Sequence, residues 1–147
     1  MGVIGEELQG LHYYIVDNTN TENVLDFFKA LFEGGSVPLA NLSKTAIVMD
    51  NHSAHTTPPV TNYLRGLGIT PLFIPPVSSP LNPIEEVWAL FKRRWRRRLV
   101  ERPPAPGKQA IFWAMGQELN AIPKPAIKSL SRGSLREMQN VLNGMPV

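Results

Sequence analysis

The chain has 147 residues, 43% of them apolar, which indicates a globular protein long enough to bury a substantial core. It has no cysteine, which excludes disulfides and thiolate metal sites, and it has neither an apolar run long enough to span a membrane nor a secretory signal pattern. The net charge is +3, but six of the fifteen basic residues lie within residues 92–98, so this local basicity predicts either a contact with a phosphate backbone or a solvated helix face.

The first third of the sequence predicts a hairpin followed by a helix. Residues 2–4 and 11–16 are short apolar or aromatic runs on either side of a turn, so we expect two antiparallel strands. A helix is then expected to begin with Thr21 as its cap and to end at Gly34-Gly35. Its core-facing positions recur at i, i+3, i+4 and i+7, and they are Val24, Phe27, Phe28 and Leu31.

Two further strands are expected to alternate with helices. Residues 44–49 and 69–74 are mostly apolar, which predicts strands that are buried on both faces. Residues 58–67, between them, predict a helix that begins at a proline and ends next to glycines. The order strand, strand, helix, strand, helix, strand, helix predicts an α/β protein in which helices cover a mixed sheet.

A long amphipathic helix is predicted to begin at Pro83 and to reach residue 99. Asn82 is a favoured N-cap and Pro83 a favoured first residue, and Glu85 takes the third position, from which a carboxylate can reach back to the capping residue. One stripe of this helix is apolar, at Ile84, Val87, Trp88, Phe91, Trp95 and Leu99. We expect the stripe to pack on the sheet, which makes its two tryptophans core residues rather than platforms for bases.

The C-terminal part is expected to be a helical extension. We divide the chain into a core, residues 1–102, and a proline-rich linker with helices, residues 103–147. From their apolar spacing, the helices of the extension are expected near residues 109–119, 123–130 and 135–142. Ser134 is a possible cap of the last one.

Motifs with a specific order lie at the ends of the predicted strands and at the start of the long helix. Asp50-Asn51 follows one strand, with His55 five residues after the aspartate, and Pro75-Pro76 follows the next strand. The string Ser79-Pro80-Leu81-Asn82-Pro83-Ile84-Glu85 then opens the helix, which continues through Trp88 and Lys92. Over about residues 2–99 this set resembles the catalytic domain of the mariner-type transposases and their bacterial insertion-sequence relatives, which belong to the DDE transposase and integrase superfamily. The 34 residues between Asp50 and Glu85 agree with the spacing typical of that family.

The resemblance implies a ribonuclease H-like fold and metal-dependent phosphodiester hydrolysis and strand transfer on DNA. In the family, an aspartate at a strand end and an acid on a later helix join a first aspartate around two Mg²⁺ or Mn²⁺ ions. Asp50 matches the second acid and Glu85 the third, with Glu86 as the alternative ligand if the helix register differs by one. The residues that match positions beside the site, where we expect supporting roles, are Asn51, His55 and Asn82. The residues expected to contact nucleic acid are Lys92, Arg93, Arg94, Arg96, Arg97 and Arg98.

The first aspartate of the family has no match in this sequence. It would lie on a strand before residue 2, and Asp17 follows a later strand and cannot replace it. We therefore expect an N-terminally truncated sheet without its central first strand, and no DNA cleavage by this chain alone. The missing strand would come from upstream sequence, from a second copy of the chain or from another chain by strand addition. Three interpretations stay open: part of an active transposase, a domesticated relative that binds DNA without catalysis, and a structural subunit of a larger assembly.

Overall fold

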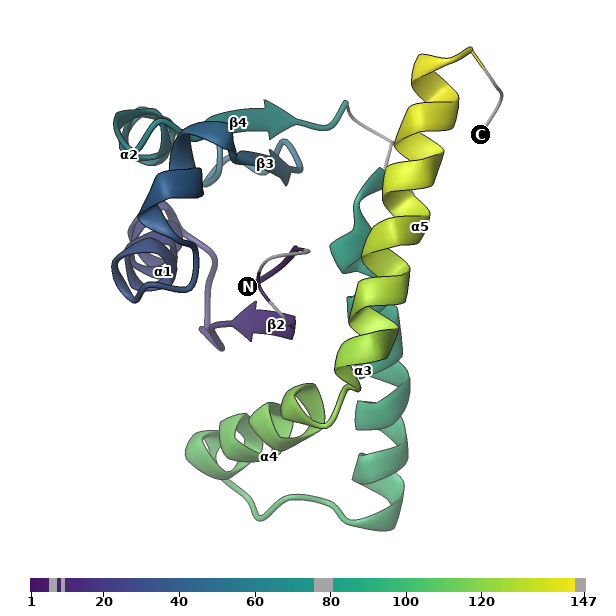
Figure 1. The fold of residues 1–147 in the computed structure, drawn as a ribbon. Coiled ribbons are helices and arrows are strands. Elements are labelled where there is room, and N and C mark those ends of the chain that lie inside the picture. The colour runs from purple at the N-terminus through teal and green to yellow at the C-terminus, as the bar shows by residue number, and fades with distance from the viewer. Residues whose placement is uncertain (6–7, 9, 76–80, 145–147) are drawn as a thin grey trace. The chain divides into compact units, whose positions relative to one another are not determined.

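The computed structural model describes residues 1–5, 8, 10–75 and 81–144 (Figure 1). It combines two small sheets with helices, so the predicted α/β class is confirmed, and the elements are consistent with a ribonuclease H-like fold. In chain order they are β1 (Gly2–Gly5), β2 (Gly10–Tyr13), α1 (Thr21–Glu33), the 3-10 helix η1 (Leu39–Lys44), β3 (Ala46–Met49), α2 (Pro58–Gly66), β4 (Thr70–Phe73), α3 (Pro83–Glu101), α4 (Lys108–Asn120) and α5 (Lys124–Leu142).

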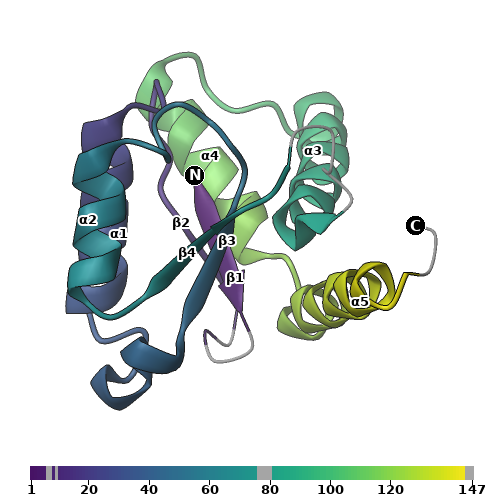
Figure 2. The ribbon, with the colours of Figure 1, turned by 90° about the horizontal axis from the view of Figure 1, so that it is seen from above.

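The first of two compact units comprises residues 1–2 and 12–82. It contains the parallel strand pair β3–β4, in which Ala46 lies opposite Thr70 and Met49 opposite Phe73. The chain passes between these strands through α2, which contacts both β4 and α1, and Figure 2 shows α1 and α2 side by side. The buried apolar residues of this unit are Val24, Phe27, Phe28, Leu31, Phe32, Val37, Leu42, Ile47, Met49, Ala54, Val60, Leu64, Ile69 and Ile74.

Only one face of the β3–β4 pair is buried, so the expectation that both faces are buried is wrong. Along β3 the side chains alternate: Ile47 and Met49 are buried, whereas Val48 is 37% exposed. The residue opposite Val48 on β4, Leu72, is 47% exposed. Successive side chains of a strand point to opposite faces, so burial in every second residue means that this unit covers the pair on one side.

The helix predicted after residue 20 is confirmed as α1, but its cap is Asn20 rather than Thr21. Asn20 has an extended backbone, and its side chain accepts a hydrogen bond from the backbone N–H of Asn23 at 2.8 Å. The predicted apolar stripe of this helix is buried. The helix ends at Glu33, and Gly35 adopts a φ of 74°, a conformation that glycine reaches without steric cost.

The N-terminal strands form the expected hairpin. β1 and β2 pair in a two-stranded sheet. Next to them, the backbone N–H of Tyr14 donates to the carbonyl of Met1 at 2.9 Å, and the amino group of Met1 donates to the carbonyl of Tyr14 at 2.8 Å. Such a reciprocal exchange is the pattern of antiparallel strands.

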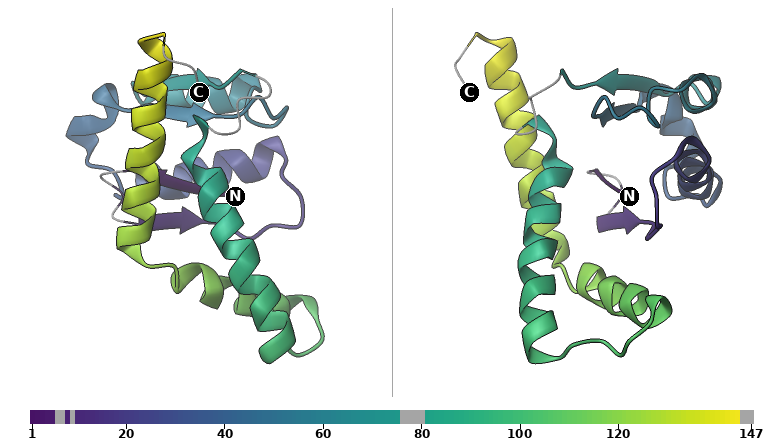
Figure 3. Two further views of the ribbon diagram at one scale, coloured as in Figure 1. Left: turned by 90° about the vertical axis from the view of Figure 1, so that its right-hand side faces the viewer. Right: turned by 180° about the vertical axis from the view of Figure 1, so that it is seen from behind.

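The second compact unit comprises residues 3–11 and 83–147. Its helix α3 contacts both α4 and α5, and α3 and α5 run side by side in Figure 3. The buried apolar residues of this unit are Val87, Phe91, Ala114, Leu119, Ile122 and Ile127. On α3 the half-buried rings of Trp88 and Trp95 lie 6.5 and 6.3 Å from the ring of Phe91, whereas Leu99 is 44% exposed. The predicted apolar stripe is therefore packed over its first turns and ends before Leu99.

The C-terminal segment forms one long helix where we expected two. α5 continues through Gly133 and Ser134 without a break, so Ser134 is not a cap. Ile127, Ser131 and Ser134 are buried, and their spacing places them along one side of the helix. Because α5 contacts α3, packing offsets the cost of about 1 kcal/mol for a glycine inside a helix.

Candidate active site

Asp50 directly follows β3, and its carboxylate organises the loop that comes after it. The Nδ1 atom of His55 lies 2.7 Å from Asp50 Oδ1, and the backbone N–H of His52 donates to the same oxygen at 3.3 Å. The Asp50 side chain is 56% exposed and that of His55 22%. The strand thus ends in a carboxylate that is held by its own loop and still reaches solvent.

Neighbouring polar groups fasten the same loop. Asn51 Nδ2 donates to the carbonyl of Ile74, directly after β4, at 3.1 Å. The backbone N–H of Ala54 donates to Nδ1 of His52 at 3.2 Å. These bonds give Asn51 a defined place at the ends of the two strands, and the bond to the aspartate does the same for His55. The supporting roles of both residues in catalysis stay predictions.

The oxygen atoms at Asp50 suit a hard divalent cation. Within the described residues, both hydrogen bonds to this carboxylate end on Oδ1, which leaves Oδ2 open. Carboxylate oxygens are ligands that Mg²⁺ takes while it keeps several waters. In the same part of the chain, no three His, Asp or Glu side chains gather closely enough to hold an ion. The Asp50 carboxylate therefore fits one ligand position of such a cation.

Glu85 and Glu86 lie in the first turn of α3, and both are exposed. The partial positive charge at a helix N-terminus favours carboxylates in this position. Glu85 is the third helical residue, as predicted, because α3 begins at Pro83. It belongs to the second compact unit and Asp50 to the first, so the metal site that the resemblance implies for both acids stays a prediction, as does the capping role of Asn82. Three residues of the preceding motifs, Pro76, Ser79 and Pro80, lie outside the described residues.

Two arginines of the basic run are engaged by a buried acid on α4. Glu118 is 7% exposed, and its Oε2 lies 3.2 Å from Arg94 Nε while its Oε1 accepts from Arg98 Nη1 at 3.2 Å. Arg98 also donates from Nη2 to Gln117 Oε1 at 2.9 Å. The Arg94 contact has the distance of an ion pair without the alignment of a hydrogen bond. Both arginine heads thus converge on one carboxylate and link α3 to α4.

The other members of the basic run are exposed. Arg97 lies 3.7 Å from Glu101 one turn later, and because both side chains are mostly in solvent this pair adds little stability. Lys92, Arg93 and Arg96 form no ion pair within the described residues. The run is therefore divided between cations that serve the fold and cations that remain available, and contact of the run with nucleic acid stays a prediction.

Sequence reasoning misses two features of the second unit. Glu118 has no local signal, because its partners depend on how α4 packs on α3. The other feature is a row of exposed basic residues on α5, each four positions after the one before: Lys124, Lys128, Arg132 and Arg136. That spacing lies along one row of a helix surface, so the sequence did contain the signal.

Comparison with models of protein families decides the family of this chain. The model described as DDE superfamily endonuclease matches residues 3–103, which is more than half of the chain. The chain belongs to the DDE superfamily endonucleases. The predicted resemblance to a DDE transposase-type domain is thus confirmed. There is no significant match among curated proteins and none among solved structures.

The family match covers the Asp50 loop, the acids at the start of α3 and the whole basic run, whereas α4 and α5 lie beyond its end. Nucleases of this superfamily act on DNA and generally use divalent metal ions. In the described part of the chain, no helix combines the length and the hydropathy that a membrane crossing requires. DNA is therefore the partner that membership of this superfamily indicates.

Proposed function

We propose that this chain provides two acidic metal ligands, Asp50 and Glu85, for DNA phosphodiester hydrolysis and strand transfer. The observation that carries the proposal is a solvent-exposed Asp50 carboxylate, fixed at the end of a strand, whose Oδ2 accepts no hydrogen bond from the residues that the structure describes. Membership of the DDE superfamily gives this carboxylate its expected chemistry. Glu85 is assigned by its place in the family motif and by its exposed position in the first turn of α3.

Each side chain of the Asp50 loop has a distinct task in this proposal. When bound, two Mg²⁺ or Mn²⁺ ions activate water or a 3′-hydroxyl and stabilise the departing oxygen of the phosphodiester. His55 holds Oδ1 of Asp50, which leaves Oδ2 as the oxygen for the metal. Asn51 fixes the loop to the residue after β4 and limits the movement of the carboxylate. Glu86 replaces Glu85 as the ligand only if the register of the helix differs by one.

We further propose that the 147 residues alone do not cleave DNA, because the family chemistry uses three acids and the sequence matches two of them. Incubation with nicked or terminal-repeat duplex and Mn²⁺ tests this point, and cleavage or strand transfer above background would refute it. The remaining strand and acid would come from sequence that precedes residue 1, from a second copy or from another chain, and in the last two cases that copy or chain is a partner of this one.

One observation favours a second candidate function, a non-catalytic relative that binds DNA or has a structural role. Asp50 accepts two bonds from its own loop, so a protein without catalysis also has a use for this acid. Under this alternative, the carboxylate stabilises the loop and no metal is needed.

Binding of Mn²⁺ to the full chain, followed by electron paramagnetic resonance of the free ion, separates the two functions. Asp50→Asn and Glu85→Gln should each weaken Mn²⁺ binding by at least about tenfold, since each removes a charged ligand. Glu86→Gln is the matched control, because it removes the same charge one residue away. A loss with Glu86→Gln instead of Glu85→Gln would move the ligand to Glu86. Unchanged binding in all three variants would favour the non-catalytic function.

A further inference from the structure

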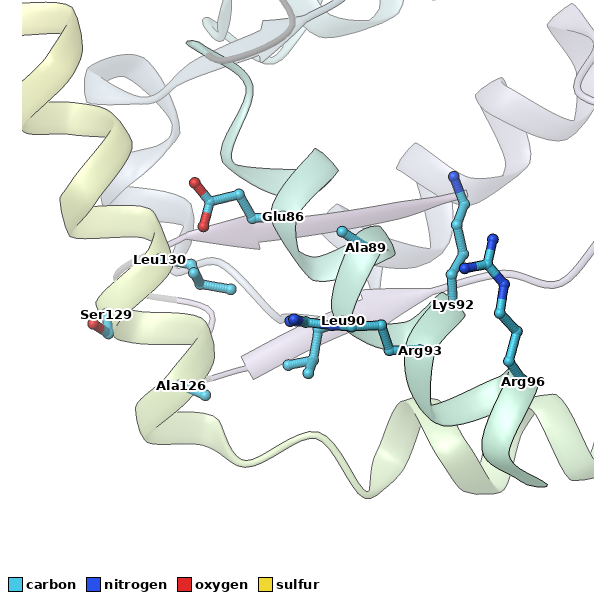
Figure 4. Close-up of a pocket in the computed structure, with 9 residues that line it drawn as sticks. All are labelled: Glu86, Ala89, Leu90, Lys92, Arg93, Arg96, Ala126, Ser129 and Leu130. Carbon is cyan, nitrogen blue, oxygen red and sulfur yellow. The ribbon is translucent and has the colours of Figure 1, made fainter. Parts of the chain in front are cut away.

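A groove of about 550 Å³ separates parts of α3 and α5 in the second unit (Figure 4). Its α3 side carries three cations, Lys92, Arg93 and Arg96, and one acid, Glu86. The rest of its lining consists of Ser129 and of aliphatic residues of both helices, which include Leu90 and Leu130. Figure 4 shows the Arg93 side chain extending toward α5, whereas Lys92 and Arg96 extend together in another direction from α3.

The three groove cations are the members of the basic run that remain available for a ligand. Arg94 and Arg98 meet Glu118, and Arg97 lies beside Glu101. In the part of the chain that the structure describes, Lys92, Arg93 and Arg96 have no carboxylate within ion-pair distance. Within about a turn and a half of helix they create a local excess of positive charge, which favours the binding of an anionic ligand.

We propose that the α3–α5 groove binds the sugar–phosphate backbone of duplex DNA through Lys92, Arg93 and Arg96, and that Arg94 and Arg98 fix α4 to α3 instead. The inference rests on the proposed function only in taking DNA as the anionic partner. The three cations lie within the family match, whereas the second wall of the groove, α5, lies beyond its end, so the groove joins a part of the matched domain to a part of the chain outside it.

The lining favours backbone contact over reading of bases. Among the described lining residues there is no aromatic side chain on which an unpaired base could stack. Arginine and lysine neutralise phosphates, whereas the aliphatic residues can contact sugars, and neither carries sequence information. The carboxylate of Glu86, which also lines the groove, repels phosphate and should weaken this contact. Binding should therefore depend strongly on salt and weakly on sequence.

The salt dependence gives the size of the effect. Each neutralised phosphate contributes about 0.9 to the slope of log affinity against log salt concentration. Loss of three contacts should flatten the slope by about 2.7, so the change in affinity between 50 and 200 mM salt should shrink by about 40-fold. This change is far larger than the error of a titration.

Fluorescence anisotropy with the full chain and a labelled 20-base-pair duplex of arbitrary sequence tests the proposal, in EDTA to prevent bridging by metal ions. The triple variant Lys92→Gln, Arg93→Gln, Arg96→Gln should show the flattened slope. The control removes the same charge from the first unit through Lys29→Gln, Lys44→Gln and Arg65→Gln, and it should keep the wild-type slope. An unchanged slope in the groove variant, or an equal change in the control, would overturn the proposal.

Two further variants exclude trivial explanations. The double variant Arg94→Gln, Arg98→Gln should lower the melting temperature. At temperatures where it is folded, it should keep the wild-type slope of log affinity against log salt concentration. If this slope flattens as much as in the groove variant, Arg94 and Arg98 also bind DNA, and the proposal that they only fix α4 to α3 is wrong. Glu86→Gln should tighten binding about twofold to fivefold, the effect of one exposed charge, which unfolding cannot imitate. Weaker or unchanged binding by Glu86→Gln would count against the groove.

The same assay separates DNA from a protein partner and from failure of the proposed function. If poly-L-glutamate binds through the three cations and the duplex does not, the groove is a site for an acidic protein and the proposal falls. If Mn²⁺ binding is unchanged in Asp50→Asn and Glu85→Gln while the groove variant still shows the flattened salt slope, the proposed catalytic role is wrong and the DNA-binding groove is supported. The reverse result removes the groove and leaves the catalytic role intact.

Discussion

Replacement of Glu118 by glutamine should destabilise the second compact unit by about 3 kcal/mol, because it leaves two arginines without their shared carboxylate. Removal of one partner from a buried ion pair usually costs about 3–5 kcal/mol. We take the low end because the Arg94 and Arg98 side chains are 28% and 14% exposed, so their heads can partly reach water. Glutamine has nearly the size of glutamate, so the loss reports charge rather than a cavity.

Tryptophan fluorescence is the appropriate assay, since all three tryptophans of the chain lie on α3 and α4. Urea unfolding of Glu118→Gln, followed by this signal, should give a lower midpoint with an unchanged slope against denaturant. For a chain of this size the same loss lowers the melting temperature by about 6–12 °C.

Two controls show whether charge is responsible. Replacement of Arg94, Arg98 and Glu118 together by methionine should regain most of the lost stability, because a well-packed apolar substitute for a buried ionic group is often neutral or stabilising. Glu101→Gln, which removes the exposed partner of Arg97, should change stability by less than about 0.5 kcal/mol. If Glu118→Gln costs less than about 1 kcal/mol, or if the triple methionine variant is as unstable as the single one, the ion pairs do not hold α4 to α3.

Two other predictions concern α2 and α5. Burial, together with the hydrogen bond from Tyr63 to Glu33 and the charge of that glutamate, raises the pKa of Tyr63 to about 12 from 10.0. Since the folded pKa is the higher one, the stability from this group is complete below pH 10 and is lost as the pH rises through 12. Ultraviolet titration should show this late tyrosine, Glu33→Gln should lower its pKa, and a titration near pH 10 in the wild type would contradict the contact. Gly133→Ala should stabilise the chain by about 0.5–1 kcal/mol, because the glycine lies inside α5 and nothing lies within 4 Å of an added methyl, and a loss in thermal melts would show that the helix is broken there.

The sequence predicted best those parts of the fold that depend on local spacing. The apolar stripe of α1 and the proline at the start of α3 each set a helix without help from distant residues. The errors arose where tertiary contacts decide. Gly133 and Ser134 suggest a helix boundary by themselves, but the contact of α5 with α3 keeps the helix continuous. Val48 is as apolar as its neighbours, and only the placement of helices on one side of the strands leaves it exposed.

In the candidate site, too, local features could be predicted from the sequence and tertiary contacts could not. The order of Asp50, Asn51 and His55 along the chain suffices to place a carboxylate and two neighbouring polar side chains in one loop. The bond between Asp50 and His55 spans five residues, and the bond of Asn51 reaches the residue that follows the paired strand β4. The separate roles of the residues in the basic run could not be predicted in this way. Its six cations look equivalent in sequence, and only the position of Glu118, on another helix, distinguishes Arg94 and Arg98 from the rest.

Glu85 is the residue that best distinguishes a catalytic from a non-catalytic protein. Asp50 has a structural task in its loop, so Asp50→Asn should lose about 1–2 kcal/mol of stability whether or not a metal binds. Glu85 is exposed, and within the described residues no hydrogen bond or ion pair holds its carboxylate. Glu85→Gln and Glu86→Gln should therefore cost similar small amounts, below about 1 kcal/mol, from the charge at the helix N-terminus. With stability matched in this way, weaker Mn²⁺ binding in the first variant but not in the second can only reflect a ligand, and equal binding in both removes the reason to assign chemistry to α3.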